Sequence, residues 1–425
     1  MILRTRLLLS TALFIASALA CGDASAATVT GSVKNASGQP AQDATVMVYS
    51  AGVRKGYSTF CPTCYVDCGK RTTTDDKGEF TIAGLDDELV FNLIVLQDGQ
   101  IPAWLRGVDP QKGVAATALL KPRPESTNAT SVFGRVVDTK ENPVPDAVVE
   151  INALLTNGGR GRYGSFPDGL AVSNAQGEFK LSANDPQLAT ALGEPVTNML
   201  MEVKPRGLAP RLYMAQVSRT QHEITLNDGA TVTGRLLFRG KAVPNAELVM
   251  LTLNRANGAG YSPMHIGTDE KGRFAMTNVP VGRTWSLAVN PDSLSEPGVA
   301  EPRFLSTGHD GEVVNVGDVV LKPGYTLSGR VVLSDGQPVP ADMRLTLATD
   351  RFGGRTVTLP PDGRFEIKGL KGAYTVLPQV RGYRVPDGVY LETLVERDIA
   401  GLTITLVPVP APMQPQAPIA APTTR

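Results

Sequence analysis

The sequence lacks an excess of charge of either sign and is poor in aromatic residues and histidine. Its 425 residues include 41 Lys and Arg against 41 Asp and Glu, and 6% are aromatic. This balance excludes the basic field with which nucleic-acid-binding proteins attract phosphates. The three histidines, His222, His265 and His309, have no second ligand at metal spacing. We therefore predict no nucleic-acid partner and no cofactor.

Motifs of catalysis are also missing. The glycine-rich segment 158–164 does not end in the Gly-Lys-Ser/Thr of a phosphate-binding loop. The turn 74–78 has too few carboxylates for a calcium loop, and no Gly-x-Ser-x-Gly elbow occurs. The sequence therefore predicts a protein that is not an enzyme.

Long amphipathic helical patterns are nearly absent, whereas turn residues are abundant. The chain has 43 Gly and 32 Pro, and 42% of its residues are hydrophobic. Alternating apolar and polar segments bounded by Gly and Pro are typical of short strands. The composition predicts an all-β chain of several small modules.

Two landmarks repeat in step along the chain. The first is a glycine in a β-like segment, spaced by 103, 100 and 95 residues: Gly31, Gly134, Gly234 and Gly329. The second is a hairpin glycine, spaced by 99, 95 and 91 residues: Gly78, Gly177, Gly272 and Gly363. Each hairpin glycine precedes a phenylalanine by two residues: Phe80, Phe179, Phe274 and Phe365. The agreement indicates four copies of one unit.

Segment 230–282 shows the physical content of this unit. Gly234 interrupts an alternating strand, which indicates a bulge or a close approach of another backbone. Gly272 stands where a tight hairpin requires a left-handed backbone, and Phe274 starts the returning strand as a core anchor.

The repeats and the short joints between them divide the chain. We predict modules at 27–124, 129–228, 229–323 and 324–410, after a leader at 1–26 and before a disordered Pro/Ala-rich tail at 411–425. Because the joints are short, we expect the modules to form a beaded rod with limited bending.

The repeated pattern Val-x-Gly-x-Val, Gly-x-Pro-x-x-x-Ala-x-Val and Thr-Asp-x-x-Gly-x-Phe resembles the carboxypeptidase regulatory-like domain. The resemblance covers about residues 28–410 and implies a tandem array of four seven-stranded Greek-key β-sandwiches, similar to transthyretin and to adhesin B-type repeats. Repeats 2 and 4 depart from it, with 173–177 and 359–363 in place of the hairpin motif. Such modules occur in proteins of many functions, so the resemblance implies a fold and no reaction.

The N-terminus predicts export. Arg4 and Arg6 precede an apolar run from Leu7 to Ala20 that is too short to span a bilayer. Cleavage before Cys21 would make a lipoprotein, whereas cleavage after Ala26 would release an ordinary secreted protein. Both alternatives place the chain in the periplasm, the outer membrane or the cell surface, with membrane contact only through a lipid on Cys21.

Cys61, Cys64 and Cys68 lie within eight residues. In an exported protein they predict a disulfide that staples a long loop, with Cys61–Cys68 the less strained pair. A metal site or a redox motif are the alternatives, although no helix is indicated to lower the thiol pKa.

One long loop per repeat carries Arg together with Tyr or Phe. Equivalent loops leave a sandwich at the same end, and Arg and aromatic rings suit hydroxyls, carboxylates and sugar faces. The alternative is that these residues only solvate flexible loops. The predicted ligand-binding residues are Arg54, Tyr57, Arg160, Arg162, Tyr163, Arg255, Tyr261, Arg351, Phe352 and Arg355.

Together these features predict a non-catalytic envelope protein that binds or scaffolds through its loops. Its expected partner is an envelope glycan or a surface or periplasmic protein, with carbohydrate the first ligand class to test. A redox or metal protein acting through the cysteine loop, and a purely structural stalk, are the alternative functions.

Overall fold

The computed structural model describes residues 26–409 apart from 114, 124–130, 165, 167, 183–192, 218–219, 253–259, 350–353 and 390. Strands dominate this part of the chain, whose helical turns are η1 (Pro110–Lys112) and η4 (Pro291–Ser293). No helix among the described residues is long and apolar enough to cross a membrane. The predicted leader with Cys21 and the tail 411–425 lie outside the described residues.

The strands form four β-sandwich modules, which confirms the predicted array. Module 1 contains β1 (Ala26–Lys34), β2 (Thr45–Val53), β3 (Arg71–Thr73), β4 (Glu79–Asp86), β5 (Leu89–Leu96), β6 (Gln100–Ile101), β7 (Ala103–Val108), β8 (Ala116–Leu119) and β9 (Lys121–Pro122). Module 2 contains β10 (Ser131–Val137), β11 (Val148–Leu155), β12 (Gly161–Tyr163), β13 (Leu170–Val172), β14 (Glu178–Ser182), β15 (Asn198–Lys204), β16 (Arg211–Gln216) and β17 (His222–Thr225).

Modules 3 and 4 continue the chain in the same way. Module 3 contains β18 (Ala230–Phe238), β19 (Lys241–Ala242), β20 (Glu247–Thr252), β21 (Met264–Gly267), β22 (Arg273–Val279), β23 (Arg283–Val289), β24 (Gly298–Val299), β25 (Arg303–Thr307) and β26 (Val313–Pro323). Module 4 contains β27 (Tyr325–Leu333), β28 (Arg344–Ala348), β29 (Arg355–Thr358), β30 (Arg364–Leu370), β31 (Gly372–Gln379), β32 (Tyr383–Arg384), β33 (Glu392–Val395) and β34 (Ile399–Pro408).

Seven strands recur in every module, three in one sheet and four in the other. In module 1 the sheets have the orders β4-β1-β8 and β3-β2-β5-β7. The first strand lies in the middle of the smaller sheet, antiparallel to the hairpin strand and parallel to the last strand. Each module encloses its own hydrophobic core between the two sheets.

The repeated glycine and phenylalanine are partners across this smaller sheet. Gly31 pairs with Phe80, and a side chain on Gly31 would lie 2.5 Å from the Phe80 ring and 2.3 Å from the Ala116 carbonyl oxygen. The other three modules repeat the pairing: Gly134 with Phe179, Gly234 with Phe274 and Gly329 with Phe365. The glycine thus makes room for the ring that fills the core, which confirms the predicted close approach.

The hairpin motif stabilises the join between the sheets. Gly78 has φ of 72°, as predicted, and the Asp75 carboxylate accepts hydrogen bonds from the backbone of Lys77 and Glu79. The buried Thr74 hydroxyl accepts from Ala44 N at 2.9 Å and donates to Ala41 O at 2.6 Å. Ser173 and Thr268 make the same pair of bonds in modules 2 and 3. In module 4 a buried leucine, Leu359, takes this place.

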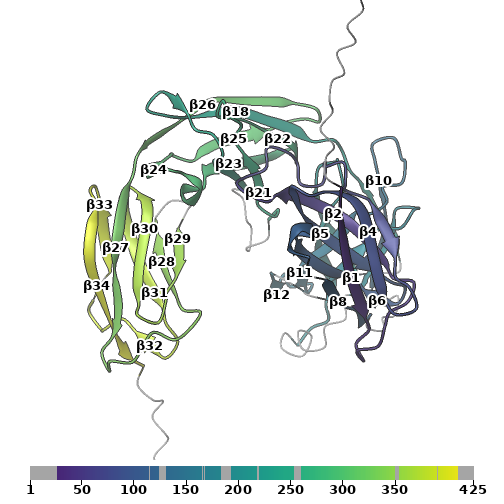
Figure 1. Cartoon of the computed structure of the whole chain (residues 1–425), viewed down its shortest axis with the longest axis horizontal. Coiled ribbons are helices and arrows are strands. Elements are labelled where there is room, and N and C mark those ends of the chain that lie inside the picture. The colour runs from purple at the N-terminus through teal and green to yellow at the C-terminus, as the bar shows by residue number, and fades with distance from the viewer. Residues whose placement is uncertain are drawn as a thin grey trace, which may run out of the picture.

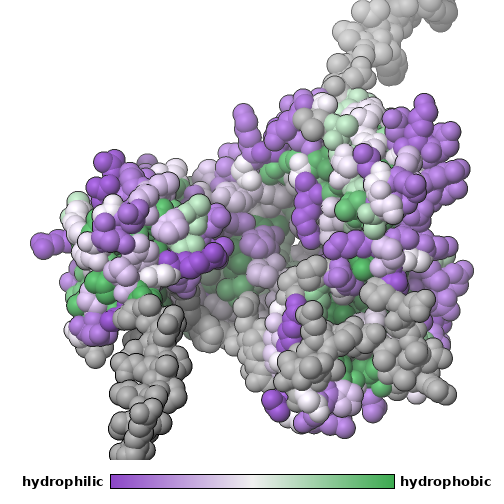
Figure 2. Space-filling model, turned by 90° about the horizontal axis from the view of Figure 1, so that it is seen from below, coloured by the Kyte–Doolittle hydropathy of each residue, from purple (hydrophilic) through white to green (hydrophobic). Residues whose placement is uncertain are grey.

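The modules form an arch, and the predicted rod is wrong. Modules 1 and 2 lie together at one end, module 3 forms the top and module 4 the other end (Figure 1). The outer faces of the four-stranded sheets of modules 1 and 2 pack on each other, because both are apolar. Their shared cluster contains Met47, Tyr49, Ile94, Ile101, Val148 and Leu170. Seen from below, the surface of the arch is mostly hydrophilic, with hydrophobic residues in smaller patches (Figure 2).

Module 3 contacts both modules of this pair. Buried Glu202 of module 2 accepts hydrogen bonds from Ser262 N at 2.9 Å and Ser262 Oγ at 2.7 Å. On the module 1 side, Tyr57 N donates to the side chain of Asn245 at 2.9 Å, and Gly267 N donates to Ser58 O at 2.6 Å. Modules 1 to 3 are therefore held together by buried and directional contacts.

Candidate functional site

The loop predicted to bind a ligand in module 1 instead makes contacts within the protein. Arg54 forms an ion pair with Asp109 at 2.7 Å, and this guanidinium holds the pKa of the Asp109 carboxyl below its usual value. Tyr57 is half-buried, and its backbone belongs to the contact with module 3. Arg54 therefore stabilises module 1 itself, and Tyr57 contributes to the contact between modules 1 and 3.

Tyr261 requires a correction, because it is a core residue and not an exposed loop residue. It is 5% exposed, and its ring lies 5.7 Å from that of Trp285, the fully buried tryptophan of module 3. Its hydroxyl accepts a hydrogen bond from Leu212 N of module 2 at 3.4 Å. The ring has no free face for a sugar, and replacing it would disturb folding.

Arg355 of module 4 also serves an inter-module contact. Its guanidinium pairs with Asp292 of η4 in module 3 at 2.5 Å and donates to Lys368 O at 3.1 Å. The other predicted residues of these loops, Arg255, Arg351 and Phe352, lie outside the described residues.

The module 2 loop keeps its predicted residues near the surface. Arg160 and Arg162 are exposed and Tyr163 is half-buried. The Arg162 guanidinium lies 4.6 Å from the centre of the Phe166 ring. Among the described residues, the structure does not bring this group together with Arg54, Tyr57, Tyr261 or Arg355 of the other modules.

The disulfide joins Cys61 to Cys64, so the favoured pair Cys61–Cys68 is wrong. The two Cα atoms are 5.2 Å apart within one tight turn. Cys68 is a free thiol that faces the core of module 1, and burial raises its pKa. Among the described residues no group of three or more His, Cys, Asp or Glu could hold a metal ion.

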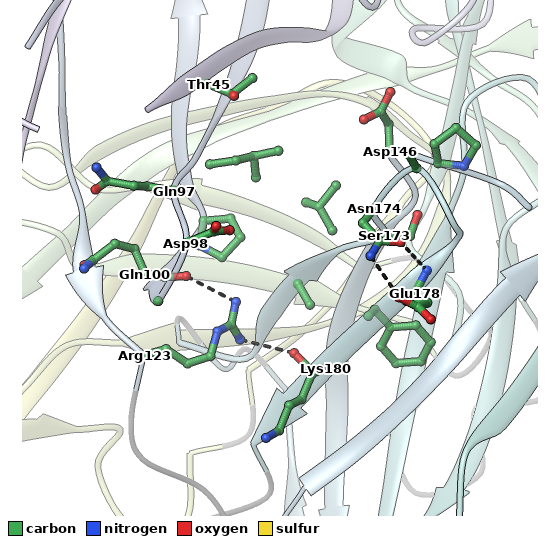
Figure 3. A pocket seen from close by; sticks show the side chains of 18 of the residues that line it. Thr45, Gln97, Asp98, Gln100, Arg123, Asp146, Ser173, Asn174, Glu178 and Lys180 are labelled. Atoms are coloured by element: carbon green, nitrogen blue, oxygen red, sulfur yellow. Dashed lines mark hydrogen bonds between the residues drawn. The ribbon is translucent and has the colours of Figure 1, made fainter. Parts of the chain in front are cut away.

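A cleft of about 1310 Å³ lies between modules 1 and 2. Two turns face each other across it. The turn 97–100 follows β5, and its Gly99 has φ of 73°. The hairpin turn 174–177 follows β13. Figure 3 shows their side chains, with Thr45, Gln97, Asp98 and Gln100 from module 1 and Asp146, Ser173, Asn174, Glu178 and Lys180 from module 2.

Some polar groups in the cleft are already engaged. Asp146 pairs with Arg71 at 2.6 Å, and the side-chain oxygen of Asn174 accepts from the backbone N–H groups of Gln176 and Glu178. Gln97 donates to Gln42 O at 2.8 Å. The buried side-chain oxygen of Gln100 has no hydrogen-bond partner within the described chain. The cleft thus combines fixed walls with polar atoms that a ligand could satisfy.

Arg123 bridges the two modules in the cleft. Its guanidinium donates to Gln100 O of module 1 at 3.3 Å and to Lys180 O of module 2 at 3.3 Å (Figure 3). A longer bond of 3.5 Å reaches Leu170 O. Burial lowers the pKa of Arg123.

Sequence reasoning missed this cleft, because its residues come from different modules and follow no shared motif. The sequence feature that could have indicated the cleft lies in the strands beneath it. Segment 46–49 is apolar at every position, although a strand with one solvated face should alternate. This pattern indicates that both faces of β2 are covered.

No protein-family model and no curated protein matches the sequence. Solved structures with some similarity include the Bacillus anthracis TIE protein, at 13% identity over 91% of this chain and 75% of that chain, with a TM-score of 0.20. A streptococcal ancillary pilin has 12% identity over 66% of this chain and 100% of its own, with a TM-score of 0.23. The RrgB pilus protein of Streptococcus pneumoniae has 11% identity over 92% and 99%, with a TM-score of 0.17.

These TM-scores are too low to support an argument about fold or function. The β-sandwich architecture follows from the strands of this chain itself. Membership of the carboxypeptidase regulatory-like family stays a prediction from the repeated motif.

Proposed function

We propose that the chain is a non-catalytic, exported envelope protein that binds carbohydrate in the cleft between modules 1 and 2. The observation that carries this proposal is the cleft itself, about 1310 Å³ in volume and lined by polar side chains of both modules. Its size lies above the usual range for small-molecule sites, which suits an extended ligand.

The chemistry of the lining suits hydroxyl groups. Sugar hydroxyls both donate and accept hydrogen bonds, so they match carboxylates, amides and hydroxyls. Asp98 and Thr45 make no side-chain hydrogen bond with the described residues, and the Gln100 side-chain oxygen has no partner. A ligand in the cleft would supply the missing partners.

The walls of the cleft are fixed before any ligand binds. The apolar contact of Met47, Tyr49 and Ile94 with module 2 lies close by, and Tyr49 Oη donates to Lys204 O at 2.8 Å. A preformed site loses less conformational entropy on binding than a flexible loop. This favours the cleft over the loop ends as the main binding site, with Arg160, Arg162 and Tyr163 of module 2 as a second surface.

The proposals that the protein is exported and that it is not an enzyme rest on observations other than the cleft. The leader 1–26 has the order of a signal peptide, and the Cys61–Cys64 disulfide suits an oxidising compartment. The sequence contains no Gly-x-Ser-x-Gly nucleophile motif, no phosphate-binding loop motif and no calcium-loop motif.

The test is binding of the purified mature chain to envelope polysaccharide from its host and to a panel of oligosaccharides. We expect Asp98→Ala to weaken binding, whereas Asp76→Ala, at an exposed turn outside the cleft, should not. Folding of both variants is checked by thermal unfolding. Equal binding by the two variants, or no binding to any glycan, would contradict the proposal.

A further inference from the structure

We infer that the ligand of the cleft carries a carboxylate, which Arg123 and Lys180 receive. This inference rests on the proposed function and names the class of glycan. It depends on two cations of the cleft, half-buried Arg123 and exposed Lys180, that have no carboxylate partner among the described residues.

Arg123 has no carboxylate partner in the described chain. Its three hydrogen bonds all go to backbone carbonyl oxygens, which are neutral. A guanidinium has five N–H donors, so two remain for a ligand. Arg123 is half-buried, and a countercharge offsets the hydration that a charge loses on burial.

Neighbouring cations show the usual arrangement. Arg71 pairs with Asp146 at 2.6 Å, and Lys121, two residues before Arg123, pairs with Asp168 at 3.5 Å. Burial also lowers the pKa of Arg123 without any acidic group nearby to offset it. An anionic group bound in the cleft would supply the missing countercharge.

Charged side chains of both signs line the cleft, and they differ in whether they are paired. The Asp146 carboxylate is paired with Arg71, whereas Arg123 and Lys180 have no carboxylate partner among the described residues. Arg123 and Lys180 lie at one end in Figure 3, and Asp146 lies at the other. Lys180 is exposed, and its ammonium makes no hydrogen bond with described residues. A ligand with its acid group at the Arg123 end would leave its hydroxyls beside Asn174, Glu178 and Gln97.

A carboxylate suits the donors that Arg123 keeps at this end of the cleft. Arg binds carboxylates through two parallel hydrogen bonds, which matches the two remaining donors. The chemistry therefore points to an acidic polysaccharide, such as one built with uronic acids.

The experiment compares one polysaccharide in two forms. Envelope polysaccharide of the host is used before and after chemical reduction of its carboxylates to alcohols, which keeps the hydroxyls and removes the charge. We expect the native form to bind the full mature chain at least about tenfold more tightly, and added salt to reduce the difference.

Two variants and a control locate the effect. Arg123→Gln and Lys180→Gln should each lose most of the preference for the acidic form, whereas Lys140→Gln, an exposed lysine of module 2 outside the cleft, should keep it. Because Arg123 also joins the modules, Lys180→Gln keeps the test valid if Arg123→Gln fails to fold.

The outcomes separate the two proposals. Equal binding of both forms, unchanged in the Lys180 variant, would overturn the carboxylate inference and leave the proposed function standing. Binding of neither form would overturn both.

Discussion

Replacing Thr268 by valine tests the role of the buried hydroxyl in the hairpin motif. Thr268 is 3% exposed, and its hydroxyl accepts from Ala246 N at 2.9 Å and donates to Val243 O at 2.7 Å. Valine has nearly the same shape, so it leaves the buried N–H of Ala246 and the partly buried carbonyl of Val243 without this partner. Since each unsatisfied group costs about 1–3 kcal/mol, we expect a loss of about 2–4 kcal/mol in the free energy of unfolding of module 3.

Trp285 reports this loss directly. It is fully buried in module 3, and the chain has two tryptophans, so a Trp104→Phe background leaves Trp285 as the single fluorophore. At an m-value of about 2 kcal/mol per M of urea, the midpoint should fall by about 1–2 M. The control is Thr284→Val, at an exposed position of β23 in the same module, for which we expect a change below about 0.5 kcal/mol. Equal midpoints for the two variants would refute the reasoning.

Three further predictions concern packing, the thiol and the interface. Gly329→Ala should destabilise module 4 by about 3 kcal/mol or more, because the added carbon would lie 2.0 Å from Leu402 O, whereas Gly52→Ala, with nothing within 4 Å, should unfold at nearly the wild-type denaturant concentration. Peptide mapping after alkylation should find Cys68 labelled only after unfolding, since it is buried with a raised pKa; labelling of the native protein would contradict this. Burial raises the pKa of Tyr49, so its contribution to the stability of the module 1–2 interface should be present below about pH 10 and decline above it. Tyr49→Phe should remove this decline in unfolding midpoints measured from pH 8 to 11, and an unchanged decline would argue against Tyr49 as its source.

The fold of each module could be predicted from the sequence because its determinants are local. The hairpin glycine needs a positive φ, and the strand glycine makes room for the ring of the phenylalanine that pairs with it on the neighbouring strand. Both requirements restrict single residues and repeat in each copy. The threonine of the motif also recurs, but its hydrogen bonds to the segment before the second strand of the module are visible only in three dimensions.

The arrangement of the modules could not be predicted from the short joints. The arrangement depends on residues such as Met47 and Ile94 on the outer face of the module 1 sheet. Their contact partners lie in another module, and no periodic pattern in the sequence indicates which residues these are. The loop prediction failed for a related reason. A loop sequence that contains Arg and Tyr looks the same whether these residues bind a ligand or stabilise the protein. Arg54, Tyr261 and Arg355 stabilise the protein itself.

The candidate site depends on this arrangement, so the sequence did not indicate it. Asp98 and Asn174 belong to ordinary turns of their own modules. They become two walls of one cleft only because the four-stranded sheets of modules 1 and 2 pack together.

The most direct test of a binding site between modules 1 and 2 is to fill the cleft. Ala175 is an exposed turn residue of the cleft wall, and Glu270 has the equivalent place in the module 3 hairpin, outside this cleft. Calorimetry should show that Ala175→Trp abolishes binding of envelope polysaccharide, whereas Glu270→Trp binds as the wild type does. Unchanged binding by a folded Ala175→Trp protein would contradict the account.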